Sequence, residues 1–279
     1  MRGVLLLLAV ASGAVMARPA ADVSPVEGER AGPAGHAPTV LVLCFEDSDI
    51  PPWRLRNHTG HNFRLLDAVA ARVGVRFDYR GLPWRRCHSA LSTGEVDGAF
   101  ANSYTPERRA MGLYPRGNGP EGPPDARFRM FVDGYVLVRR RGDPVRLDEG
   151  RIVGLDGPVG SQAGYSIVDD LRRKGVAVEE GSPDPMALLR KLAEGRVGAA
   201  ALGTSKMREL EATGDPVFER LETLPDPLVR KDYFLMLSRQ RYARDPALAE
   251  ALWEAIADLR DEVPVAAPPA ATPPVGAAR

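Results

Sequence analysis

The chain has 279 residues, of which 44% are apolar, and its 37 basic residues balance its 37 acidic residues. A chain of this length and apolar content can bury one large core or two smaller ones. The balanced charge argues against binding to nucleic acid, and no segment approaches the roughly 18 uncharged apolar residues of a membrane span, so we expect a protein that is not embedded in a membrane.

The first residues indicate export. A positive start, an apolar core over residues 4–10 and a small-residue cleavage site at Ala17 predict a signal peptide over residues 1–17. Residues 18–38 are rich in Ala, Pro and Gly and predict a flexible linker, whereas residues 263–279 predict a disordered Pro/Ala-rich tail. We therefore expect a periplasmic protein.

Strand-like and helix-like segments alternate after the linker. An apolar run predicts the first strand, and apolar residues at helical spacing before Gly74 and Gly94 predict helices that end at these glycines. The first five elements are a strand at 39–45, a helix at 63–73, a strand at 75–79, a helix at 84–93 and a strand at 96–101. This order predicts a β-α-β-α-β unit with a parallel sheet.

The same pattern then starts again. A leading aspartate and proline mark one of its helices, Thr204 is the expected N-cap of another, and the last helix carries apolar residues on one face. The expected elements are strands at 152–155, 176–179, 196–202 and 232–238 and helices at 165–174, 184–194, 204–212 and 246–259. Two α/β modules therefore share one chain.

Residues 103–109, SYTPERR, follow the third predicted strand. Thr105 is the expected N-cap of an α-helix, with Pro106 at its first position and Arg108 at its third. A helix N-terminus carries unpaired N–H groups, and a guanidinium beside them adds a rigid fork of donors. This arrangement suits a small carboxylate. The alternative is an ordinary capped surface helix with a solvated arginine.

The order of eight segments resembles the type II periplasmic solute-binding proteins, especially the polar amino-acid-binding family (family 3) of ABC transporters. The resemblance covers residues 40–259, and no single segment is diagnostic. The segments are FEDSDIPPW, the helix ending ARVG, the helix that begins at Trp84, LSTGEVDGAF, SYTPERR, IVGLDG, KLAEGRVGAAALG and DYFLMLS. The resemblance implies an α/β fold of two lobes, each a mostly parallel sheet flanked by helices, that trap a ligand when they close.

The resemblance also implies how the chain is divided. Two hinge crossings are expected, at residues 131–139 and 227–234. The first lobe would then comprise residues 39–132 plus 233–262, and the second lobe residues 133–232. The family implies a monomer without a cofactor that captures a small carboxylate-bearing solute, an amino acid or a related organic acid, for the permease of an ABC importer or for a membrane receptor.

The resemblance assigns ligand-binding roles in the first lobe. Arg108 matches the arginine that clamps the ligand α-carboxylate, and Ser103 matches a contact in the preceding loop. Trp53 matches a position at the mouth of the lobe where ligand side chains stack, although a half-buried packing tryptophan is an equal alternative.

The second lobe is expected to offer a helix N-terminus to the same carboxylate. Tyr165 and Ser166 fall at this position, with Gly160 and Ser161 as the alternative because the preceding segment is longer than the family's usual turn.

Two departures from the family bear on the ligand. Amino-acid binders place an aspartate for the ligand ammonium after the strand in GRVGAAALG, where this chain has Gly203 and Thr204; Arg64 stands where an aspartate is common. An uncompensated buried ammonium would cost several kcal/mol. Either a first-lobe acid replaces the missing charge, or the ligand is not a simple α-amino acid. The candidate acids are Glu46, Asp47 and Asp49.

The two cysteines, Cys44 and Cys87, are expected to form a disulfide, because export permits one and the predicted layout brings the end of the first strand near the start of the second helix. Two buried thiols are the alternative. The histidines at 58, 61 and 88 give only a weak HxxH signal, so we expect no metal.

A binding protein is expected rather than an enzyme. The sequence has no GxSxG elbow, no HExxH helix and no phosphate-binding glycine loop. Two alternatives remain open. One is an enzyme of the dehydratase type on the same scaffold, with a carboxylate as general acid. The other is a periplasmic sensor subunit that presents its closed form to a membrane receptor.

Overall fold

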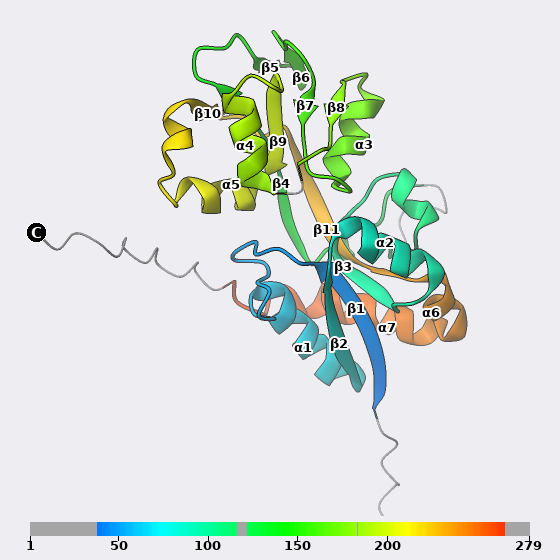
Figure 1. Cartoon of the computed structure of the whole chain (residues 1–279). Helices are drawn as coiled ribbons and strands as arrows, with labels where there is room; N and C mark the ends of the chain where they lie inside the picture. The colour runs from blue at the N-terminus through cyan, green and yellow to red at the C-terminus, as the bar shows by residue number, and fades with distance from the viewer. Residues whose placement is uncertain (1–37, 116–121, 183, 266–279) are drawn as a thin grey trace, which may run out of the picture. The chain divides into compact units, whose positions relative to one another are not determined.

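The structure, a computed structural model, describes residues 38–115, 122–182 and 184–265 (Figure 1). The signal peptide predicted over residues 1–17, all but the last residue of the predicted linker and nearly all of the predicted tail lie outside the described residues.

Nine of the described strands form one mixed sheet whose order is β2-β1-β3-β11-β4-β9-β7-β8, with β10 also paired to β4. The remaining two, β5 and β6, form a separate ribbon. The described strands are β1 (Thr39–Glu46), β2 (Val75–Leu82), β3 (Gly98–Ser103), β4 (Phe131–Arg140), β5 (Arg146–Asp148), β6 (Arg151–Val153), β7 (Val159–Gly160), β8 (Val178–Glu179), β9 (Ala199–Gly203), β10 (Leu221–Thr223) and β11 (Val229–Leu237).

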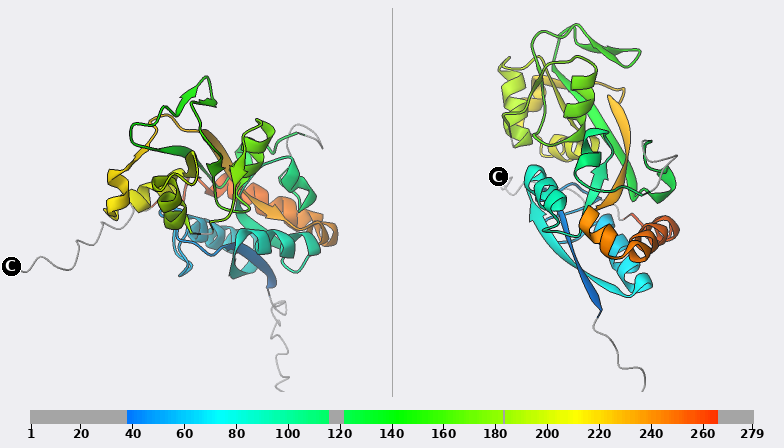
Figure 2. Two further views of the ribbon diagram at one scale, coloured as in Figure 1. Left: turned by 45° about the horizontal axis from the view of Figure 1, so that its top comes forward. Right: turned by 90° about the vertical axis from the view of Figure 1, so that its right-hand side faces the viewer.

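Helices pack against the sheet in both of its halves, on either side of the central strands, as the two turned views show (Figure 2). Three short 3-10 helices, η1 (Glu107–Ala110), η2 (Ala126–Phe128) and η3 (Pro216–Glu219), join the larger elements. The described α-helices are α1 (His61–Val73), α2 (Trp84–Thr93), α3 (Ser166–Arg173), α4 (Pro185–Ala193), α5 (Thr204–Glu211), α6 (Arg239–Arg244) and α7 (Pro246–Leu259).

Strands β4 and β11 run through the middle of the sheet and connect two α/β groups (Figure 1). The first residues of β11 pair with β4 and its last residues pair with β3, both antiparallel. We call β1–β3 with α1, α2, α6 and α7 the first lobe, and β7–β9 with α3, α4 and α5 the second lobe. The α/β class is confirmed, while the residue boundaries of the lobes stay a prediction.

Each lobe repeats one topology. Parallel strands lie in the order β2-β1-β3 in the first lobe and β8-β7-β9 in the second, so the first strand of each unit lies in the middle. In the first lobe, α1 and α2 end at Gly74 and Gly94 in the left-handed conformation, as predicted. The apolar face of α1 packs in a core cluster with the fully buried Phe45, Phe63 and Phe100, whereas the apolar face of α2 packs in a second cluster with Cys44 and Ala99.

Two predictions for the second half of the chain are wrong. The strand expected at 152–155 does not enter the main sheet, because β6 pairs only with β5. The strand in its place is the two-residue β7, which follows glycines in the left-handed conformation at 154 and 157. The helix after β9 is not capped by Thr204, because Gly203 is its N-cap. Helix α6 was not expected at all.

Candidate functional site

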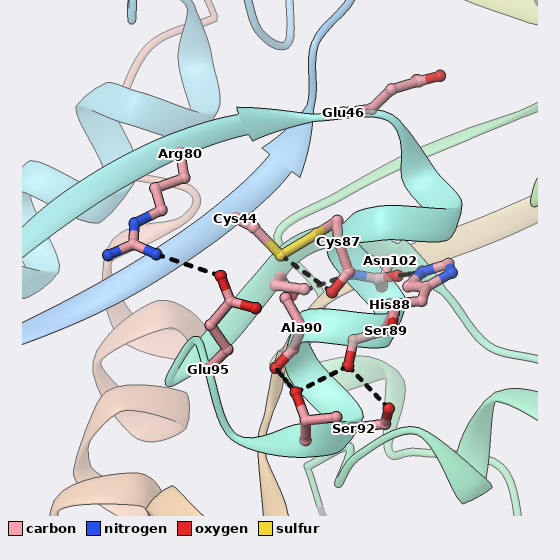
Figure 3. Close-up of a disulfide and its surroundings, with 12 residues drawn as sticks. Cys44, Glu46, Arg80, Cys87, His88, Ser89, Ala90, Ser92, Glu95 and Asn102 are labelled. Atoms are coloured by element: carbon pink, nitrogen blue, oxygen red, sulfur yellow. Dashed lines mark hydrogen bonds and ion pairs between the residues drawn. A yellow bond between two sulfur atoms is a disulfide. The ribbon is translucent and has the colours of Figure 1, made fainter.

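The end of β1 is tied to α2 by the predicted disulfide (Figure 3). The sulfur atoms of Cys44 and Cys87 are 2.03 Å apart, both residues are fully buried, and 43 positions separate them. Glu46 lies two residues further along the strand, on the side where β1 ends. The covalent bond therefore fixes the strand end that carries Glu46 against the helix that begins at Trp84.

Glu46 is a buried carboxylate that both lobes contact. Arg54 Nη2 lies 2.8 Å from Glu46 Oε2, and the hydroxyl of Tyr165 donates to the same oxygen at 2.5 Å. Burial raises the pKa of Glu46, and the charge of Arg54 and the hydrogen bond from Tyr165 oppose this shift. The carboxylate of the first lobe thus holds the first turn of the second lobe's α3 segment.

Arg108 lies on a 3-10 helix of four residues, so the prediction of an α-helix with Arg108 in its first turn is wrong. The predicted N-cap is also wrong, because Pro106 and not Thr105 is the N-cap of this short helix, although the Arg108 N–H donates to Thr105 Oγ1 at 3.3 Å. The Arg108 guanidinium donates from Nη1 to the Ser103 carbonyl at 2.9 Å and from Nη2 to the Gly164 carbonyl at 2.7 Å. With only 3% of its surface exposed, Arg108 lies buried between the lobes.

Two cationic side chains, those of Arg54 and Arg108, lie over the ring of Trp84. The guanidinium carbons of Arg54 and Arg108 lie 5.7 and 5.9 Å from the ring centroid, within cation–π range. His88 stacks on the same ring at 4.9 Å, and its Nε2 lies 2.8 Å from Asn102 Oδ1. Burial and the neighbouring Arg108 lower the pKa of His88 to about 4, so the ring is neutral at pH 7.

The two predicted serines meet across the lobes. Ser103 Oγ and Ser166 Oγ are 2.6 Å apart, and the Tyr135 hydroxyl lies 3.3 Å from Ser166 Oγ. Thr105 Oγ1 donates to Asp169 Oδ2 at 3.1 Å. The start of α3 therefore faces the SYTPERR segment, as the resemblance implied for Tyr165 and Ser166, whereas the Ser161 hydroxyl donates to the Ala201 carbonyl within the second lobe.

Trp53 bridges the lobes on the other side of the site. Its indole Nε1 donates to Ser205 Oγ at 2.9 Å, and its ring stacks on Phe131 at 4.4 Å. Phe131 in turn stacks on Tyr233 at 4.7 Å. The half-buried tryptophan thus packs against β4, and its polar edge contacts the second lobe.

A cavity of about 30 Å³ lies among these groups, with room for one or two water molecules. It adjoins two hollows, of about 390 and 560 Å³, that share lining residues with it. Of the predicted residues, Ser103, Arg108 and Tyr165 line the cavity itself; Trp53 and Thr204 line the larger hollow, and Asp47 is exposed and lines neither. The charged residues that line the cavity are Arg54, Arg108, Asp133 and Lys206, and Glu46 lies behind Arg54 and Tyr165, which it contacts.

Three of these charged residues were missed from the sequence. Arg54 follows the predicted Trp53, and Lys206 occupies the third position of α5, so adjacency to a predicted position was the available signal. Asp133 lies on a central strand, where only the fold reveals that it faces the cavity. Arg64, the other departure from the family, is remote from the cavity and donates to the Pro264 carbonyl at 3.0 Å.

The described residues contain neither a candidate metal site nor a candidate membrane-spanning helix. They contain no group of three His, Cys, Asp or Glu side chains that could hold a metal ion. His58 stacks on Phe63 at 5.3 Å, His61 lies 5.8 Å from Trp53, and His88 stacks on Trp84, so the three histidines have separate surroundings. No helix within residues 38–265, where described, is long and apolar enough to cross a membrane.

Comparison with known proteins shows the fold. No protein-family model and no curated protein matches the chain. Among solved structures, a histidine kinase sensor domain similar to periplasmic binding proteins matches at 20% identity, covering 81% of this chain and 92% of its own, with a TM-score of 0.63.

Two further matches are binding proteins. The GluR0 ligand-binding core from Nostoc punctiforme, solved with L-glutamate, matches at 19% identity over 80% of this chain and 93% of its own, with a TM-score of 0.59. A substrate-binding protein of an ABC uptake transporter from Streptococcus pneumoniae, solved with histidine, matches at 16% identity over 80% and 87%, with a TM-score of 0.60. The chain thus has the type II periplasmic-binding-protein fold.

Proposed function

We propose that this chain is a periplasmic substrate-binding protein that captures a small carboxylate-bearing solute between its lobes and delivers it to an ABC importer. The observation that carries the proposal is Arg108. It is buried at the junction of the lobes, and no described carboxylate forms an ion pair with it. A buried guanidinium that donates only to neutral carbonyls is suited to a carboxylate ligand, which offers it two parallel charge-assisted hydrogen bonds.

Closure of the lobes follows from the contacts around Arg108. Side chains of the first lobe reach the second lobe through short hydrogen bonds at both edges of the cavity, from Ser103 to Ser166 and from Trp53 to Ser205. Surface ion pairs between Arg85 and Glu180, at 3.1 Å, and between Arg173 and Glu107, at 2.6 Å, flank them. A cavity of about 30 Å³ admits a solute of several carbon atoms only if the lobes first separate.

The compartment also fits this role. The disulfide between Cys44 and Cys87 is stable in an oxidising environment such as the periplasm, and it stabilises the lobe that carries Arg108. The predicted signal peptide over residues 1–17 supplies the export route. The protein acts as a monomer, with no cofactor.

Thermal-shift screening of the chain from Arg18 onward against amino acids, keto acids, dicarboxylates and aromatic acids tests the proposal. A ligand at about 100 times its dissociation constant stabilises the native state by about 2.7 kcal/mol. Small-angle scattering with that ligand should show compaction, and the ligand should be recovered chemically unchanged. Turnover would favour the dehydratase-type enzyme, and a complete panel without any shift would contradict the proposal.

A sensor subunit is the second candidate, favoured by the likeness to a histidine kinase sensor domain. The two candidates share the ligand site and differ in the membrane partner. Crosslinking of the ligand-loaded protein in membranes distinguishes them, because an importer yields a permease adduct and a sensor yields a receptor adduct.

A further inference from the structure

Charged side chains of both signs line the cavity, and two of them lack a charged partner. The Arg54 guanidinium pairs with Glu46 at 2.8 Å, and the Lys206 ammonium pairs at 2.5 Å with the carboxylate three positions further along α5. Among the described residues, Arg108 donates to carbonyls and forms no ion pair, and Asp133 forms none either. One cation and one anion of the cavity wall are therefore left for a ligand.

Neutral donors hold the Asp133 carboxylate at the edge of the second lobe. It accepts hydrogen bonds from the hydroxyl and the backbone N–H of Ser205, at the start of α5, and from the backbone N–H of Gly134. Burial raises the pKa of Asp133, and these bonds oppose that rise. The exposed Arg208 acts on the carboxylate through its charge but forms no ion pair with it. An ionised carboxylate has about four lone-pair sites, so three donors leave room for a cationic group of a ligand.

Arg108 and Asp133 lie at different ends of the cavity. Arg108 also lines the hollow of about 390 Å³, whereas Asp133 also lines the hollow of about 560 Å³. The Arg108 guanidinium is held at the Ser103 carbonyl, where β3 ends, and Asp133 lies on β4. Strand β11 runs between these two strands, which sets their backbones about 10 Å apart, or two strand spacings. A ligand that contacts both charges therefore spans the cavity.

Tyr233 of β11 lies between the two charges. Its backbone pairs with Ser103 on one side and with Phe131, two residues before Asp133, on the other. The charges of Arg108 and Asp133 both act on its buried hydroxyl, in opposite directions. The aromatic side chain thus separates the cationic end of the cavity from the anionic end.

We propose that the solute is an ω-amino acid, whose carboxylate binds Arg108 and whose ammonium, at the other end of its chain, binds Asp133. This inference rests on the proposed function and names the class of its ligand. Closure then buries two compensated pairs of charges, whereas a ligand without an ammonium would leave Asp133 buried and unpaired. An α-amino acid carries its ammonium nitrogen only about 2.5 Å from the carboxylate carbon, which places the ammonium at the Arg108 end of the cavity.

Two acids line the hollow at the Arg108 end, outside the cavity itself. Glu180 pairs with two arginines, at 3.1 and 2.5 Å. Asp169 accepts from the Thr105 hydroxyl at 3.1 Å. Asp169 is therefore the partner that an ammonium next to the ligand carboxylate would use, whereas an ammonium at the far end uses Asp133. The two aspartates distinguish the two classes of amino acid.

Matched isomers test this class by isothermal titration calorimetry. The probes are 4-aminobutyrate and 5-aminopentanoate, their α-isomers L-2-aminobutyrate and L-2-aminopentanoate, and butyrate and pentanoate, which lack the ammonium. We expect the tighter-binding ω-amino acid to bind at least about tenfold more tightly than its α-isomer and than its unsubstituted acid.

The outcomes separate this inference from the proposed function. An α-isomer or an unsubstituted acid that binds as tightly as the ω-amino acid would overturn the inference and leave the proposed function intact. The same holds if the only binders in the wider screen lack an ammonium distant from the carboxylate. If no carboxylate binds at all, the proposed function fails as well.

Substitution of each aspartate tests the assignment with the preferred ω-amino acid and its unsubstituted acid. Asp133→Asn keeps the size and one acceptor oxygen but removes the charge, so it should abolish the preference for the ω-amino acid and leave binding of the unsubstituted acid nearly unchanged. A merely structural role of Asp133 would weaken both ligands equally. Asp169→Asn should keep the preference. A preference that persists in Asp133→Asn, or that Asp169→Asn abolishes, would contradict the assignment.

Asp184→Asn is the matched control for Asp133→Asn. Asp184 also accepts a backbone N–H at the start of a helix of the second lobe, that of Ala187 at 2.7 Å, and it lines none of the hollows at the site. This variant should leave all affinities unchanged. If Asp133→Asn does not fold, the comparison of isomers on the unmodified protein still decides the class of the ligand.

Discussion

The two lobes share one topology but build their halves of the site differently. In the first lobe, a disulfide, a buried ion pair and the ring of Trp84 hold the functional side chains in fixed positions at the end of β1 and the start of α2. In the second lobe, the corresponding strands β7 and β8 have two residues each, and the site is supplied by the beginnings of α3 and α5.

This difference implies that the two lobes contribute differently to ligand binding. In the proposed function, Arg108 is the cationic anchor of the first lobe, where the Ser103 carbonyl holds its guanidinium. The second lobe contributes hydroxyl and carbonyl groups that meet the first lobe through single hydrogen bonds, such as that from Arg108 to the Gly164 carbonyl. Changes to the first lobe should therefore have large effects on binding or stability, and changes to the second-lobe hydroxyls should have small effects on closure.

The largest effect is expected at Arg108. Arg108→Ala leaves the ligand carboxylate desolvated against neutral donors, and we expect a loss of about 2 to 5 kcal/mol in binding free energy. Arg108→Lys should also bind poorly, because an ammonium cannot form two parallel hydrogen bonds. Calorimetry with the ligand identified by the screen measures both losses.

Arg109→Ala is the matched control for this prediction. Arg109 is the next residue on the same short helix, and it lines neither the cavity nor the adjoining hollows. Its replacement should leave the affinity nearly unchanged. Equal losses at both positions would mean that a diffuse basic surface, and not a specific anchor, attracts the ligand.

Removal of the disulfide should have the next largest effect, on stability alone. The bond between Cys44 and Cys87 closes a loop of 43 positions, and the chain-entropy estimate predicts a loss of about 3 to 4 kcal/mol when both residues become alanine. Urea denaturation measures this loss. Because the crosslink lies in the first lobe, the urea midpoint for unfolding of the second lobe should change little if the two lobes unfold separately. Two reactive thiols in the unfolded, unreduced protein would show that the bond is absent.

Acid should destabilise the protein through His88. The ring is protonated near pH 6.5 when unfolded but only near pH 4 when folded, so the unfolded state binds more protons between these values and stability falls as the pH falls. We expect this residue to account for about 2 kcal/mol between pH 7 and pH 5. His88→Gln should flatten the pH dependence by that amount. An unchanged slope of unfolding free energy against pH would show that His88 does not titrate as proposed.

The contrast between the lobes also explains which sequence predictions are confirmed. The strands and glycine-ended helices of the first lobe are long and regular, and α1, α2 and α7 begin or end within two residues of their predicted bounds. The strands of the second lobe were harder to predict. A strand of two residues, such as β7, has no periodicity, and the apolar residues of β6 give the pattern of a strand in the main sheet. Hydrophobic periodicity therefore predicts an element only where that element is long enough for the pattern to repeat.

Prediction of the candidate site from local sequence patterns was limited in the same way. Arg108 and Ser103 were predicted because they belong to one short motif. The choice among Glu46, Asp47 and Asp49 could not be made from the sequence, since all three lie in one segment, and only the structure shows Glu46 buried, Asp47 exposed and Asp49 paired with Arg56 at 3.3 Å. Lys206 and Asp133 reach the cavity through packing of elements far apart in the chain, which no local pattern encodes.

The smallest effect is expected for the hydrogen bond between Trp53 and Ser205, which supports closure from the second lobe. Trp53→Phe removes the donor, keeps the stacking on Phe131 and should weaken ligand binding by about 0.5 to 1.5 kcal/mol. Ser205→Ala removes the same bond and also a donor to Asp133, so its effect should be slightly larger.

The double variant separates this bond from its surroundings. If the hydrogen bond is the shared element, combining Trp53→Phe with Ser205→Ala should cost little more than Ser205→Ala alone, which gives a coupling energy close to the loss in Trp53→Phe. Thr93→Ala is the matched control, because the Thr93 hydroxyl donates to the Ser89 and Ala90 carbonyls at the end of α2 and the residue lines neither the cavity nor the adjoining hollows. Strictly additive losses would show that Trp53 and Ser205 act independently, and that the second lobe closes on the ligand without this contact.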